Sequence, residues 1–255
     1  MKKVVLSIFV ATIILASCKN KSSEPETDIS LNDIALADTA IEESIPEYLY
    51  VTASSGLSLR EYNNLSSDRL AKMPYGTKVK VIVTENKLTM NVGGIPGGMN
   101  ELEFNRKKGF AFNGYLSKFF PPERDIKVKG YARELKTYFP AVGYTESVGG
   151  SASKPSNTET LSLPTTLWHE AFFVAQQLFD FPKEFDYPNP KGKDKQVIQN
   201  SKSKDKGWKN QLEVSRHDNE LERIEYVYES QKFDSTITIL KDGNTMKISR
   251  TETIN

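Results

Sequence analysis

The chain has 255 residues, 38% of them hydrophobic, which is enough for one large domain or two small ones. Its formal net charge is +1, and it becomes −1 without Lys2 and Lys3 of the N-terminal leader, because 32 basic residues then oppose 33 acidic ones. A balance so close to neutral argues against a nucleic-acid-binding protein, since such proteins carry a basic surface. The single cysteine, Cys18, excludes an intrachain disulfide.

The first residues predict a secretory signal. Lys2 and Lys3 precede an apolar run of 13 residues, 4–16, which only Ser7 and Thr12 interrupt. Crossing a bilayer as a helix takes roughly 20 apolar residues. A shorter run behind a basic start is typical of a signal peptide.

The signal ends in Leu-Ala-Ser-Cys at residues 15–18, and this ending resembles the lipobox of bacterial lipoproteins. The resemblance implies that residues 1–17 are removed and that Cys18 becomes the first mature residue, with a diacylglyceryl group on its sulfur. Several acyl chains, palmitate among them, anchor a protein stably where one chain would not. We therefore expect Cys18 to be the lipid attachment site of a bacterial cell-envelope protein, at the outer membrane, on its periplasmic or its surface face. A free cysteine in an uncleaved anchor is the alternative.

Residues 18–47 predict an acidic flexible tether. Eight acidic residues lie between Glu24 and Glu47, whereas the two lysines of the segment stand next to the leader. A segment without aromatic residues buries too little apolar surface to offset the entropy of ordering it, and like charges extend it. The apolar residues within 29–36 leave a short docking patch as the alternative.

Residues 48–121 predict a small all-β domain. Strands are expected at 57–61, 79–83, 99–104, 109–112 and 115–118. The glycine-rich residues 91–98 are expected to form a loop, and residues 106–108 a turn. Short strands separated by turns favour a barrel or a sandwich over a βαβ fold.

The order of these elements resembles the bacterial SH3-like domains of cell-envelope proteins. The matching residues are Leu-Ser-Leu-Arg at 57–60, Pro-Tyr-Gly-Thr-Lys-Val-Lys-Val at 74–81, Lys-Gly-Phe-Ala-Phe at 108–112 and Tyr-Leu at 115–116. Met99 and Phe110 stand where this family often has tryptophan, and the family's Gly-Pro pair after the first-strand arginine is absent. The resemblance implies an all-β SH3-like barrel that binds cell-wall peptides or other protein segments, often to position a hydrolase.

Four aromatic residues near the expected loops are the candidate ligand-binding residues: Tyr62, Tyr75, Phe110 and Tyr115. Aromatic side chains give a large contact area and lose little conformational entropy on binding. The expected ligand is a peptidoglycan peptide or another envelope protein. The alternative is that Phe110 and Tyr115 belong to the core and that the other two are ordinary surface residues.

Residues 123–255 predict a small α+β domain in which a helix packs on an antiparallel sheet. The boundary is expected at Pro121 and Pro122, since proline readily continues neither a strand ladder nor a helix. Helices are expected at 131–139 and 167–179, and strands at 141–148, 158–163, 211–216, 221–229, 233–241 and 245–254. Residues 183–209, with eight lysines and four acidic residues, are expected to form a long solvated loop, with a membrane or anionic-polymer contact as the alternative.

The expected helix at 167–179 carries one aromatic residue away from its apolar stripe. Helical geometry places Phe173 with His169 and Gln176 on the polar side, and Thr165 or Thr166 is the expected N-cap. We expect Phe173 to pack against the barrel or a neighbouring loop as an interdomain contact.

Catalytic signatures are incomplete in this sequence. His169 and Glu170 open like the zinc-protease motif His-Glu-x-x-His, but Phe173 occupies the position of the second histidine. His217 is the only other histidine, and the sole cysteine is assigned to the lipid. The combination resembles bacterial lipoproteins with an SH3-like domain and a C-terminal domain of unknown function. We therefore predict a non-catalytic binding or adaptor module without metal or cofactor. An envelope enzyme, such as a hydrolase with its active site in 123–255, is the alternative.

Overall fold

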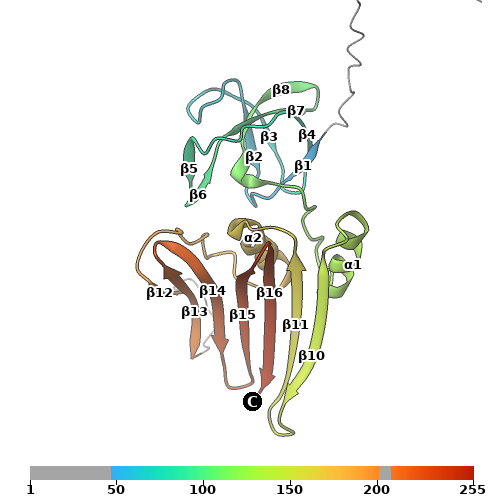
Figure 1. Cartoon of the computed structure of the whole chain (residues 1–255), viewed down its shortest axis with the longest axis vertical. Helices are drawn as coiled ribbons and strands as arrows, with labels where there is room; N and C mark the ends of the chain where they lie inside the picture. Colours follow the sequence, from blue (N-terminus) through green and yellow to red (C-terminus); the bar gives the residue numbers. More distant parts are fainter. Residues whose placement is uncertain (1–46, 201–207) are drawn as a thin grey trace, which may run out of the picture. The chain divides into compact units, whose positions relative to one another are not determined.

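The computed structural model describes residues 47–200 and 208–255, which are mostly β, with open antiparallel sheets and two helices (Figure 1). The predicted signal peptide, Cys18 and the tether up to residue 46 lie outside the described residues. Contacts group the described residues into one compact unit.

The first sheet is antiparallel and has seven strands, coloured blue to green in Figure 1. They are β1 (Tyr48–Val51), β2 (Leu57–Arg60), β3 (Arg69–Met73), β4 (Lys78–Val83), β7 (Met99–Phe104), β8 (Lys107–Phe112) and β9 (Leu116–Ser117). The strand order is β3-β2-β8-β7-β4-β1-β9, so β3 and β9 lie at its two ends. Side chains from all of these strands meet in one apolar cluster, in which Leu59, Met73 and Leu102 are fully buried.

Residues 91–98 were predicted to be a loop, and this prediction is wrong. They contribute to a hairpin of β5 (Met90–Val92) and β6 (Ile95–Gly97). Gly93 and Gly94 supply the consecutive positive φ angles, 59° and 82°, that a two-residue hairpin turn requires. A second turn of this kind lies at residues 105–106. Strand β8 therefore begins at Lys107, within the residues 106–108 that were predicted to be a turn.

The second sheet is also antiparallel and has seven strands, in the order β10-β11-β16-β15-β14-β13-β12. They are β10 (Gly143–Gly150), β11 (Pro155–Leu163), β12 (Lys195–Gln199), β13 (Lys209–His217), β14 (Glu220–Glu229), β15 (Phe233–Asp242) and β16 (Thr245–Ile254). The segment 183–209, predicted to be a long loop, therefore contains β12, which pairs with β13 at the edge of the sheet.

One face of the second sheet carries the apolar core. The helices α1 (Val128–Tyr138) and α2 (Trp168–Leu178) pack there, α1 on β10 and β11 and α2 on β15 and β16. Ile237 and Ile239 alternate toward this core, as the two-residue period of a strand requires. On the other face hydroxyl groups pair across strands, for example Thr160 Oγ1 with Ser249 Oγ at 2.8 Å.

The apolar side chains form two clusters that divide along the chain. The buried members of the first lie within 51–116 and those of the second within 119–248. Phe173 of α2 and Tyr187, in the loop after α2, are partly buried and pack against both clusters.

This division predicts how the first sheet behaves alone. We expect residues 44–123 to unfold cooperatively and to give a β-type circular dichroism spectrum, because the first cluster draws its buried side chains from 51–116. The free energy of unfolding of residues 44–123 should be roughly 1–3 kcal/mol lower than the free energy of unfolding of the first sheet in residues 44–255. The reason is that Phe173 and Tyr187 no longer cover the first cluster. Urea titrations of both chains measure this difference. A chain without a cooperative transition would show that the second sheet completes the first.

Candidate functional site

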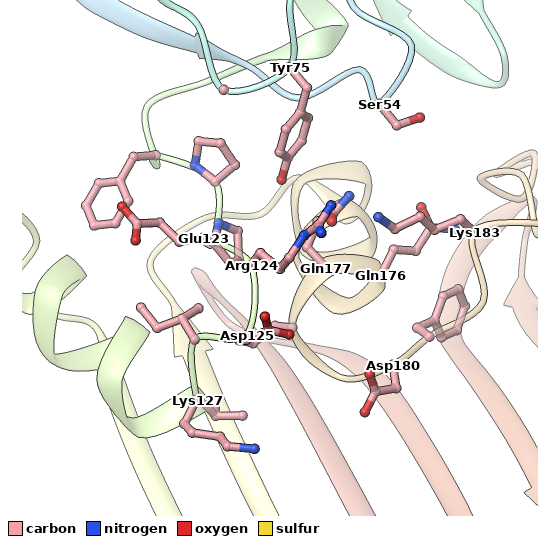
Figure 2. Close-up of a pocket in the computed structure, with 18 of the residues that line it drawn as sticks. Ser54, Tyr75, Glu123, Arg124, Asp125, Lys127, Gln176, Gln177, Asp180 and Lys183 are labelled. Atoms are coloured by element: carbon pink, nitrogen blue, oxygen red, sulfur yellow. The ribbon is translucent and has the colours of Figure 1, made fainter.

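A cleft with a volume of about 1150 Å³ lies where loops of the first sheet, the linker at 120–127 and the C-terminal end of α2 meet (Figure 2). We call it the junction cleft. Ser54 and Tyr75 line it from the first sheet, and Gln176 and Gln177 from α2. Figure 2 shows Tyr75 with its hydroxyl group directed into the cleft.

Charges of both signs surround the junction cleft. The basic residues are Arg124, Lys127, Lys183 and Arg250, and the acidic ones are Glu123, Asp125, Glu159, Asp180 and Glu184. Arg250 Nη2 lies 2.8 Å from Glu159 Oε2, and Arg250 Nη1 lies 3.6 Å from Asp180 Oδ2. Because charges of both signs line the cleft, it suits a ligand that itself carries both.

A second hollow, of about 620 Å³, adjoins the junction cleft and shares Ser54, Gln176 and Lys183 with it. We call it the aromatic groove. Its aromatic lining consists of Phe112, Tyr115, Phe173, Phe185 and Tyr187. The ring centroid of Tyr115 lies 5.7 Å from that of Phe112 and 5.8 Å from that of Phe173. Burial, and to a lesser degree the charge of Asp186, raises the pKa of Tyr115.

The structure brings some of the sequence-predicted residues together and leaves others apart. Tyr75 lines the junction cleft, and Tyr115 and Phe173 line the aromatic groove. Tyr62 is exposed in the loop between β2 and β3, and Phe110 packs half-buried on the first cluster. Neither Tyr62 nor Phe110 lines the two hollows.

Gln176 and Tyr187 are among the residues of this region that were not predicted to belong to a site. Gln176 Nε2 donates hydrogen bonds to the backbone oxygens of Pro182 and Phe185, at 3.2 and 2.8 Å. These bonds fix the loop after α2, which carries Tyr187 to the groove. The only signal in the sequence is the prolines of 182–190, which indicate a rigid loop but not its course.

His169 was expected on the polar side of the helix, and this expectation is wrong. Its side chain is buried, and its ring meets that of Tyr187 edge-on at 6.1 Å. Burial lowers the pKa of His169 from 6.5 to about 4. The polar side predicted from helical geometry is covered here by the loop after α2, so His169 lies in the interior as a neutral ring.

Glu170 is a second buried ionisable residue at the start of α2. Ser117 Oγ of β9 donates a hydrogen bond to Glu170 Oε1, and Thr165 Oγ1 donates one to Glu170 Oε2, both at 2.5 Å. Burial raises the pKa of Glu170, and these two hydrogen bonds and the charge of Lys118 oppose that rise. Thr165 was one of the two expected N-caps, but Leu167 is the N-cap residue.

In residues 47–200 and 208–255, no group of three or more His, Cys, Asp or Glu side chains could hold a metal ion. No helix within these ranges is long and apolar enough to cross a membrane. No family model, curated protein sequence or solved structure matches the chain.

The buried histidine predicts a pH dependence of stability. A lowered pKa means that the stability His169 contributes is present above pH 6.5 and lost as the pH falls toward 4, by up to about 3 kcal/mol. We expect His169→Gln to lose less stability than wild type between pH 6.5 and 4 in urea titrations of residues 44–255. Glu170 has a raised pKa, so its contribution is present at low pH and declines above about 4.5; because both proteins contain it, the comparison isolates His169.

The control is His217→Gln, since the His217 side chain is 82% exposed. It should retain the pH dependence of wild type. Identical pH dependence in the His169 variant and in wild type would contradict the buried, neutral state of His169.

Proposed function

We propose that this protein is a lipid-anchored, non-catalytic binding module of the bacterial cell envelope, which holds an extended peptide in the junction cleft and the aromatic groove. One observation carries the proposal. Tyr75 and Tyr115, selected from the sequence as ligand-binding residues, line two adjoining hollows that share Ser54, Gln176 and Lys183.

We infer further that the first sheet is an SH3-like barrel. Its short antiparallel strands surround a single cluster, which supports this interpretation. The residues that carry the resemblance fall on ordered elements: 57–60 form β2, and 74–81 form the turn into β4 and its first residues.

The lining of the two hollows favours a peptide as ligand. The faces of Tyr115 and Phe173 offer apolar contact area, and the amide groups of Gln176 and Gln177 can pair with a peptide backbone. Charges of both signs at the cleft suit a peptidoglycan peptide, which carries free amino and carboxylate groups. A segment of another envelope protein is the second ligand of this chemistry.

Purified sacculi test the site. We expect residues 44–255 to co-sediment with sacculi, and Tyr75→Ala to weaken this binding about tenfold, because an aromatic anchor at an interface contributes on the order of 1–3 kcal/mol. Tyr62→Ala is the matched control and should bind as wild type does, since Tyr62 is 59% exposed and lines neither hollow. Thermal unfolding of both variants shows that each is folded.

Two outcomes would contradict this proposal, and a third would decide between its two ligands. Absence of binding to sacculi would exclude peptidoglycan and leave a segment of another envelope protein as the ligand. Equal binding by both variants would place the site elsewhere. Release of soluble fragments from the sacculi would instead identify an envelope enzyme.

Anchoring has a separate test, which depends only on the leader. We expect Cys18→Ser to accumulate as an unprocessed precursor without palmitate label, because its hydroxyl group does not replace the thiol that accepts the lipid. Ser22→Ala is the control and should mature and take up label. If Cys18→Ser matures to the wild-type size and is labelled, the lipoprotein interpretation is wrong.

A further inference from the structure

A hollow with a volume of about 750 Å³ lies between α1 and β10, and four basic side chains line it. We call it the basic groove. The four are Lys127, Lys129, Arg133 and Lys136, and no acidic residue is part of the lining. This distinguishes the basic groove from the junction cleft, where acidic residues stand among the basic ones.

The cations of the basic groove have no close carboxylate partner within the described part of the chain. None of them takes part in the ion pairs that the described residues form. Glu134, the only acidic residue of α1, lines a different hollow together with Tyr138. Glu146 and Glu159 lie near the groove, where the hydroxyl group of Tyr144 donates to their oxygens at 3.1 and 3.0 Å, and Glu159 is also paired with Arg250.

The spacing of these cations works against the helix that carries them. Lys129, Arg133 and Lys136 follow i, i+4 and i+7, which places them on one face of α1. Like charges four residues apart destabilise an isolated helix. An anionic partner would offset this repulsion. The row of cations on α1 is therefore suited to binding a negatively charged partner.

The floor of the basic groove is apolar. Ala132 and Val142 are buried, and the half-buried ring of Tyr144 extends the floor toward β10. A cationic rim over an apolar floor matches an amphiphile whose phosphate group lies beside glycerol and acyl carbons. A free phosphate ion would use the rim and leave the floor unused.

We propose that the basic groove binds the phosphate headgroups of anionic phospholipids and thereby holds the folded part of the protein against a membrane surface. This site lies beyond the peptide-binding function and does not depend on it. It shares with that function Lys127, which also lines the junction cleft, and the expected lipid anchor, which would keep a membrane within reach. The stem of each lysine and arginine can cover the apolar floor while its charge reaches the headgroups.

Vesicle sedimentation of residues 44–255 tests the proposal without the lipid anchor. We expect binding to vesicles of phosphatidylglycerol mixed with phosphatidylcholine, and no binding to phosphatidylcholine alone. The triple variant Lys129→Ala, Arg133→Ala, Lys136→Ala should bind about tenfold to a hundredfold more weakly, given the contribution of each basic residue at an anionic membrane. It leaves Lys127 and the junction cleft unchanged, so binding to sacculi should persist.

The matched control removes the same charge elsewhere. Lys191, Lys193 and Lys195 are exposed in the segment before and at the start of β12, and their triple alanine variant should bind vesicles within about twofold of wild type. An equal loss of vesicle binding in both triple variants would show that net charge alone drives binding. It would overturn the proposal that the basic groove is the binding site. Absence of wild-type binding would overturn it as well. If the protein binds glycerol 3-phosphate saturably but does not bind vesicles, the ligand of the basic groove is a soluble phosphate ester and not a membrane surface.

Discussion

One buried carboxyl group connects the two seven-stranded sheets of this protein. Glu170 accepts hydrogen bonds from Ser117 at the end of the first sheet and from Thr165 ahead of α2. A buried carboxyl group is costly unless its oxygens are paired, so these bonds restrict where α2 can lie. The position of α2 in turn determines how Phe173 and Gln176 line the aromatic groove and the junction cleft. The geometry of both hollows therefore depends on this contact.

Much of the fold was predictable because its signals are local. The strands from 211 to 254 have alternating apolar residues and short turns, and the structure contains strands in each of these places. The missed elements lack that signal. In β3 only Met73 is fully buried, and β12 is an edge strand in a lysine-rich segment. Both are strands because they pair with a neighbouring strand, β3 with β2 and β12 with β13. The local sequence pattern does not indicate this pairing.

The candidate site was predictable only in part, for a related reason. Tyr75 and Tyr115 were selected because aromatic residues near loops suit binding, and both line hollows. His169 was placed on the polar side because helical periodicity treats that side as solvent. The loop after α2 covers it instead, and the bonds of Gln176 that hold this loop join residues six and nine positions apart without any repeating pattern.

The outer face of the second sheet has a consequence for proteins crowded on a surface. Across β11 and β16 the hydroxyl groups of Thr158 and Thr251, and of Thr160 and Ser249, pair with each other. An antiparallel sheet can leave one face to water when that face is polar. Because the paired hydroxyl groups make this part of the face polar, it gives neighbouring copies little apolar surface on which to stack. Molecules that the proposed lipid anchor would confine to two dimensions would meet often, and such a face would resist aggregation there.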